Sequence, residues 1–234
     1  MNKLLLHLVA KNCQKSALVT HLQELANELI STLDLADAKA TVMLAHDDDP
    51  MRATGDARPL PVAFDASLEV KTSATDAFVR FEKAVKGLLN KLDVFIHADL
   101  SAIQAGVDIV FVAADPTAIR FQYCMRRRAD FSNTDYLQRY EDIHSAFGLG
   151  TKGIEGYVQF HIDQAASKAI AQAAGFGVSQ VDSVSELHID TMEKFLEGIS
   201  QGIEAGDPGE DEDKFVDRPH SVMWVSDEIY RLGY

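Results

Sequence analysis

The chain has 234 residues, of which 47% are hydrophobic and 25% charged, a composition typical of a globular protein. Its net charge of −14 at pH 7 argues against partners that are nucleic acids or anionic membranes, because both require a basic surface. Two cysteines outside any C-x-x-C spacing argue against a disulfide framework and a structural zinc site. The short apolar N-terminal run is interrupted by His7, and no run approaches the roughly 20 residues of a membrane span. We therefore expect a cytoplasmic protein.

Residues 1–113 show the order strand, helix, strand, strand, helix, strand. Period-two and helical spacings of apolar residues predict strands at 4–9, 41–46, 64–72 and 107–112, and helices at 16–31 and 73–92. A loop with three prolines, residues 47–61, separates the second and third strands, because proline interrupts regular structure. A linker is predicted at residues 113–116.

Residues 117–234 repeat this order. Strands are predicted at 119–126, 155–162, 184–190 and 220–227, and helices at 132–147, 164–174 and 191–199. The run GDPGEDED at residues 206–213 is predicted to be a solvated acidic loop. A pattern that occurs twice is the signature of a duplication.

The most distinctive motifs lie in residues 119–163. Arg126-Arg127-Arg128 follow a predicted strand, a predicted helix runs from Tyr136 to its end near His144, and the next strand carries Tyr157-Val158-Gln159-Phe160-His161. This pattern resembles that of the EthD family. The resemblance covers about residues 119–228 directly and the first half only through the repeat.

The resemblance implies a ferredoxin-like βαββαβ unit that pairs into a dimeric α/β barrel. Combined with the duplication, it predicts an α+β fold in which two ferredoxin-like repeats close an intramolecular barrel, residues 1–113 being a degenerate repeat and 117–234 the EthD-like one. Two independent domains are the competing layout. The chain departs from the usual family motif at Ala129-Asp130 and Ser145-Ala146-Phe147, where glycine and proline are common.

Polar side chains of the second half are predicted to share the inner face of the barrel. Side chains at positions i and i+2 of a strand point the same way, which groups Tyr157 with Gln159 and His161, and Glu186 with His188. His144, at a helix end, is expected to approach the sheet. A histidine beside a carboxylate or a tyrosine can act as a general acid or base near neutral pH.

We expect His144 or His161 to move a proton, with Glu186 and Tyr157 orienting it. The predicted catalytic residues are thus His144, His161 and Glu186, and the predicted substrate-binding residues are Tyr157, Gln159, His188, Trp224 and Arg126. The alternative interpretation is that these residues only fill a small barrel with hydrogen-bonded polar groups.

The resemblance implies a small apolar or aromatic substrate processed by acid/base chemistry without a cofactor, as in a dehydratase, decarboxylase, cyclase or monooxygenase. A non-catalytic carrier of a hydrophobic ligand and a haem-binding barrel remain alternative functions. As a partner we also consider a second copy of the chain, in a homodimer of single-chain barrels. Fe(II) held by His161, Glu186 and His188 is a weaker hypothesis, because no rigid metal-binding spacing is present, and we predict no metal. The usual dinucleotide, nucleotide and hydrolase motifs are absent from the sequence.

Overall fold

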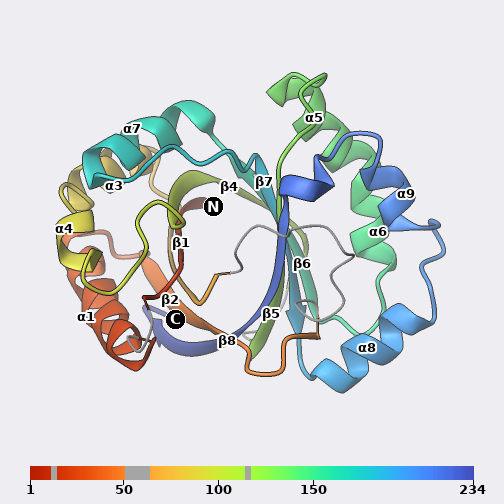
Figure 1. Cartoon of the computed structure of the whole chain (residues 1–234), viewed down its shortest axis with the longest axis horizontal. Coiled ribbons are helices and arrows are strands. Elements are labelled where there is room, and N and C mark those ends of the chain that lie inside the picture. Colours follow the sequence, from red (N-terminus) through yellow and green to blue (C-terminus); the bar gives the residue numbers. More distant parts are fainter. Residues whose placement is uncertain (12–14, 51–63, 114–116) are drawn as a thin grey trace.

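The computed structural model describes residues 1–11, 15–50, 64–113 and 117–234. Its centre is a closed barrel of eight strands in which every pair of neighbours is antiparallel (Figure 1). The strands are β1 (Asn2–Leu8), β2 (Lys39–Ala45), β3 (Ala66–Thr72), β4 (Ala102–Val112), β5 (Ile119–Met125), β6 (Gly156–Ile162), β7 (Ser183–Ile189) and β8 (Val222–Leu232). The predicted linker at 113–116 and most of the predicted loop at 47–61 lie outside the described residues.

The strand order around the barrel, β1-β3-β2-β8-β5-β7-β6-β4, divides into two equivalent sets. Within each set the fourth, first, third and second strands are neighbours in that order, which is the ferredoxin-like arrangement. The two sets join edge to edge, β2 to β8 and β4 to β6. The predicted α+β fold of two ferredoxin-like repeats in one barrel is therefore confirmed.

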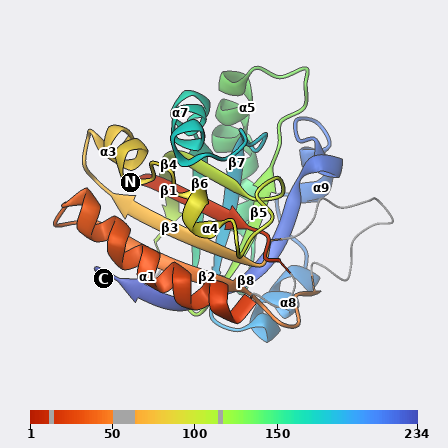
Figure 2. The same cartoon turned by 60° about the vertical axis from the view of Figure 1, so that its left-hand side comes forward.

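Helices cover the outside of the barrel in two groups (Figures 1 and 2). The first group is α1 (Lys15–Leu33), α3 (Ala77–Ala84), α4 (Leu89–Leu92) and α7 (Gln164–Ala174). The second group is α5 (Asn133–Arg139), the π-helix η1 (Tyr140–His144), α6 (Ser145–Gly150), α8 (Met192–Ser200) and α9 (Pro208–Glu212), and the 3-10 turn η2 (Arg218–His220) precedes β8.

The two groups pack differently on the sheet. Leucines of α1, with Phe81 of α3 and Ile170 of α7, join the apolar outer face of β1 to β4 in one continuous hydrophobic core. Although α7 follows β6 in the chain, it packs on β4 and α3. On the second half, smaller clusters around Tyr136 and around Phe195 lie beneath the helices. A pocket lies between this half of the sheet and its helices, as described below.

One predicted element of the second half is wrong, and another begins two residues later than predicted. Residues 208–212 form helix α9 instead of a solvated loop, because Asp207 accepts a hydrogen bond from the backbone N–H of Gly209 and Pro208 occupies the first turn. The last strand begins at Val222, and His220 belongs to η2. The other predicted helices and strands match observed elements, although the helix predicted at 73–92 is divided into α3 and α4 and the fourth strand begins earlier, at Ala102.

Candidate functional site

A pocket of about 600 Å³ lies between the outer face of β5, β6 and β7 and the helices α6, α8 and α9. Most of its wall is apolar, and its apolar side chains include Phe121, Phe147, Leu187, Phe195, Ile199 and Met223. Its polar side chains are Tyr123, His144, Thr151, Tyr157, Ser185, Asp207 and Glu212. A mainly apolar cavity with a few polar groups is typical of a small-molecule site.

His144 is fixed in one orientation by a carboxylate behind it. Its Nδ1 lies 3.1 Å from Oδ2 of Asp211, which is buried. Because an ionised carboxylate only accepts, Nδ1 carries the proton and Nε2 keeps its lone pair. Burial lowers the pKa of His144, although Asp211 opposes the shift. The imidazole is thus neutral at pH 7 and can take up a proton through Nε2.

Glu212 is the second titratable group at this end of the pocket. Its Oε1 lies 3.9 Å from Nε2 of His144, and its Oε2 lies 3.3 Å from Nε of Arg218. Burial raises the pKa of Glu212 to about 7, even though Arg218 acts in the opposite direction. A carboxyl that titrates near neutral pH beside a neutral imidazole forms an acid/base pair.

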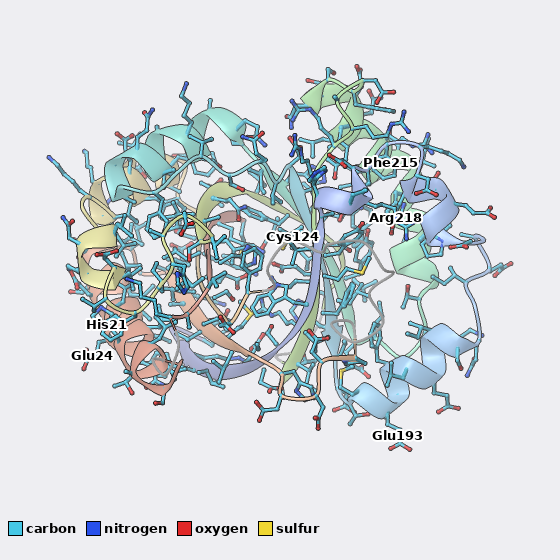
Figure 3. All side chains as sticks on the ribbon, in the orientation of Figure 1. His21, Glu24, Cys124, Glu193, Phe215 and Arg218 are labelled. Atoms are coloured by element: carbon cyan, nitrogen blue, oxygen red, sulfur yellow. The ribbon has the colours of Figure 1, made fainter. Side chains whose placement is uncertain are left out.

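Local structure explains how these two residues meet. His144 ends the π-helix η1, a form of helix often found at functional sites, and Tyr140, Phe147 and Phe215 surround its ring. Figure 3 labels Phe215 and Arg218 beside α9. Arg139 donates to Asp211 from the preceding turn, so the carboxylate that orients His144 is itself held.

Tyr157 reaches the pocket from the sheet and is oriented by two neighbours on its own strand. Nε2 of Gln159 donates to the Tyr157 hydroxyl at 2.7 Å, and Oε1 of Gln159 lies 2.9 Å from Nε2 of His161. Burial raises the pKa of Tyr157 to about 12 and lowers the pKa of His161 to about 4. Both side chains are therefore neutral at pH 7. His161 itself is not among the lining residues.

The predicted inner face was assigned wrongly for β6. Phe160 is in one cluster with Leu5 and Trp224 inside the barrel, whereas the alternate residues Tyr157, Gln159 and His161 face the helices. The apolar side chains of this strand therefore point into the barrel, and the polar ones contact η1 and α6.

The predicted residues of β7 and β8 point into the barrel, as expected. Gln122 of β5 pairs with Glu186 of β7 on one side and with Trp224 of β8 on the other, and all three side chains are fully buried. Nζ of Lys3 lies 2.8 Å from Oε1 of Glu186, and His188 lies next along β7 on the same face. These residues are thus separated by the sheet from His144 and Tyr157.

Two further predictions concern a cation and a metal. Arg126, at the end of β5, is partly exposed and lies 3.6 Å from Asp217, outside the pocket lining. The weaker metal hypothesis placed His161 with Glu186 and His188, but these residues lie on opposite faces of the sheet. Within the described ranges, no group of three or more His, Cys, Asp or Glu is arranged to hold a metal ion.

Asp211 and Glu212 were missed as functional residues. The run of acidic residues was interpreted as solvated, yet only 4% of Asp211 and 6% of Glu212 is exposed. The sequence did contain a signal, because Asp followed by Pro at 207–208 is a typical helix start. A short helix there packs its last two residues, Asp211 and Glu212, against the rest of the protein.

Residues 128–219 match the EthD domain. No curated protein matches the chain in sequence. None of the helices in the described part of the chain has the length and apolarity that a membrane span requires.

Solved structures with the same fold cover almost all of the chain. An anthrone oxidase-like protein is 10% identical with a TM-score of 0.63, covering 99% of this chain and 92% of its own. A proposed monooxygenase from Fusobacterium nucleatum is 8% identical with a TM-score of 0.54, covering 98% and 93%. A proposed chlorite dismutase is 8% identical with a TM-score of 0.51, covering 98% and 94%. The resemblance to the EthD family is therefore confirmed for residues 128–219, within a chain that folds as the dimeric α/β-barrel proteins do.

Proposed function

We propose that this protein is an enzyme that transfers protons to and from an apolar or aromatic small molecule in the pocket of the second half. The observation that carries the proposal is the position of His144, whose Nε2 lies 3.9 Å from Glu212 while Asp211 holds Nδ1. The names of two structural neighbours, an anthrone oxidase-like protein and a proposed monooxygenase, are consistent with small-molecule chemistry in such a barrel.

The pocket residues have distinct roles in this proposal. Nε2 of His144 removes a proton from a carbon or oxygen acid of the ligand, and Asp211 stabilises the imidazolium that results. Glu212, protonated in part at neutral pH, returns a proton to the ligand. Phe121, Phe147 and the other apolar wall residues exclude water from the reacting atoms, which strengthens these interactions.

Tyr123, Tyr157 and Ser185 are polar residues on the sheet side of the pocket. The Tyr157 oxygen already accepts from Gln159, so its own proton is available for an oxygen of the ligand. The substrate class that fits is an apolar ring system with one or more oxygen substituents.

Haem fits the lining less well. The side chains that line the pocket in the described ranges include neither lysine nor arginine to bind the haem carboxylates. Glu212 also stands beside Nε2 of His144, the atom that would ligate iron. We therefore assign no step to haem.

The test measures proton transfer without assuming a complete reaction. Anthrone, a tricyclic ketone with an acidic CH₂ group, is incubated with the protein in deuterated buffer without oxygen, and exchange at the CH₂ group is followed by NMR. Catalysed exchange is expected, and His144→Asn should slow it about a hundredfold or more. Binding of anthrone is measured separately on the same samples.

His161→Asn is the matched variant, because it makes the same change at a histidine outside the pocket lining. A large loss with His161→Asn and none with His144→Asn would assign the base to His161 instead. Tight binding of anthrone with no exchange above the buffer rate would favour a carrier and contradict the enzyme.

A further inference from the structure

A second cavity, of about 230 Å³, lies at one end of the barrel interior, separated by the sheet from the pocket of His144. It is bounded by the first residues of β2 and β5 and by the last residues of β3, β7 and β8. Nothing in the proposed function uses this cavity.

The lining of this cavity is rich in cations. It includes four cationic side chains, Lys39, Lys71, Arg120 and Arg231, against two carboxylate side chains, Asp108 and Glu228. A cationic lining is unexpected in a chain with a net charge of −14. Arg120 is only 3% exposed, so the site includes a buried guanidinium as well as half-exposed side chains.

The carboxylate oxygens of the lining already have cationic partners. Oδ1 of Asp108 lies 2.7 Å from Nζ of Lys3, and its Oδ2 lies 3.0 Å from Nζ of Lys71. Oε1 of Glu228 accepts from Arg120, and its Oε2 accepts from Nε of Arg231 at 2.6 Å. These carboxylates are therefore not available for a cationic ligand.

The lining cations, in contrast, have donors to spare. Arg120 uses Nε and Nη1 in ion pairs, and Arg231 uses Nε and Nη2, which leaves the remaining guanidinium nitrogen of each without a hydrogen-bond partner among the described residues. The guanidinium of Arg231 also lies over the ring of Tyr234. Lys39 contacts the ring of Tyr234 but has no ion pair within the described ranges. A site whose acceptors are occupied and whose N–H donors are unused favours a ligand that only accepts hydrogen bonds.

We propose that this cavity binds a small oxyanion, a carboxylate or a phosphate, through Lys39, Arg120 and Arg231. Planar guanidinium groups match the paired oxygens of both kinds of anion, and Lys39 adds a point charge. The volume of the cavity limits the ligand to a small molecule or to the anionic end of a larger one.

The experiment titrates the intact chain with inorganic phosphate and, in a separate arm, with malonate, at constant ionic strength set by sodium chloride. Isothermal titration calorimetry measures the affinity. Saturable binding of either anion supports the proposal, and the preferred anion identifies whether the source is a phosphate or a carboxylate. The absence of saturable binding in both arms overturns it.

Lys39→Gln locates the site, because Lys39 can be replaced without breaking an ion pair of the barrel interior. We expect this variant to weaken binding about tenfold and Lys39→Arg to restore it. Lys86→Gln makes the same change in charge at an exposed residue outside the cavity and should leave the affinity unchanged. Equal affinities for wild type and Lys39→Gln would overturn the site, provided that the fluorescence of Trp224, the only tryptophan, shows an intact barrel.

Discussion

At the scale of single residues, the chemistry of the site depends on the protonation states of two carboxyl groups, those of Asp211 and Glu212. Asp211 is kept ionised by His144 and Arg139, which lower its pKa against the effect of burial. Glu212, one residue later, pairs with Arg218 but is kept partly protonated at neutral pH by burial, which raises its pKa. Two adjacent carboxyl groups on one short helix thus have different roles because their surroundings differ.

The raised pKa of Glu212 predicts a pH dependence of activity. If Glu212 donates a proton, kcat/KM should fall as the pH rises through about 7, where this carboxyl ionises. Glu212→Gln should lower the activity and remove that decline. The measurement is a pH profile of anthrone exchange for both proteins, and a decline near pH 7 that persists in the variant would assign it to another group.

The same shift has a consequence for stability. The pKa of Glu212 is about 7 in the folded protein against an ordinary value of 4.5. Between pH 4.5 and pH 7, therefore, the folded state binds the proton more tightly than the unfolded state does. The free energy of unfolding therefore decreases as the pH rises through this window, by roughly 3 kcal/mol in total. Urea unfolding of wild type and Glu212→Gln at pH 5 and pH 8 should show the variant gaining relative stability at the higher pH.

At the scale of elements, the sequence predicts the strands and helices well and their faces less well. The alternation in β6 correctly indicates two unlike faces. The helix side was expected to be apolar, but Tyr140 and the Tyr157–Gln159–His161 series satisfy each other there. Tyr140 lies 19 residues from Gln159 along the chain and on another element, and periodicity contains no information about such a partner.

Polar residues of β1 show why polarity alone could not settle this assignment. Lys3 and His7 alternate with leucines in β1, and both are fully buried inside the barrel. An interior that accommodates such residues is itself polar, so polarity alone cannot distinguish the two faces of the sheet. The contact of His144 with Asp211 of α9 could not be predicted from periodicity, because the two residues lie 67 positions apart in the chain.

Close packing of helix α8 on the loop that follows α6 positions one wall of the pocket. A Cβ atom at Gly198 would lie 2.1 Å from the backbone oxygen of Lys152, so no side chain fits without displacing the helix. Gly198→Ala should lower the free energy of unfolding by about 1–3 kcal/mol and weaken ligand binding, because Phe195 and Ile199 of α8 line the pocket. Thermal unfolding and anthrone titration measure the two effects.

Gly177→Ala is the matched control. A Cβ atom at Gly177 has nothing within 4 Å, and this glycine does not have a positive φ. Similar effects of the two substitutions would show that the tight contact at Gly198 does not position α8.

At the scale of the whole molecule, a buried ion-pair network joins the two halves. Nζ of Lys3, in the first half, lies 2.8 Å from Glu186 in the second and also contacts Glu69 and Asp108. Burial opposes the ionisation of Glu186, but Lys3 and its neighbouring cations lower its pKa to about 2. We propose residues 1–113 and 117–234 as the two repeats that this network connects.

Removing the central cation should therefore destabilise the barrel as a unit. Lys3→Met leaves three buried carboxylates without their common partner, and we expect a loss of about 3–5 kcal/mol in the free energy of unfolding at pH 7. Urea unfolding followed by Trp224 fluorescence gives the value, with Lys86→Met as the control at an exposed lysine. A loss no greater than that of the control would show that the network contributes little to stability.

The contribution of Glu186 also has a defined pH range. Its folded pKa of about 2 lies below the ordinary 4.5, so its stabilising effect is complete above about pH 4.5 and is lost as the pH falls through about 2.

The closure of the barrel within one chain, through β2–β8 and β4–β6, has a consequence for how the site can change. In a barrel assembled from two identical polypeptides, every inherited substitution appears on both sides of the molecule. Here each side has its own sequence, so one side can be filled for rigidity while the other varies to suit a ligand. In this protein the side beneath α1 is continuously packed, whereas the side beneath α8 contains a cavity.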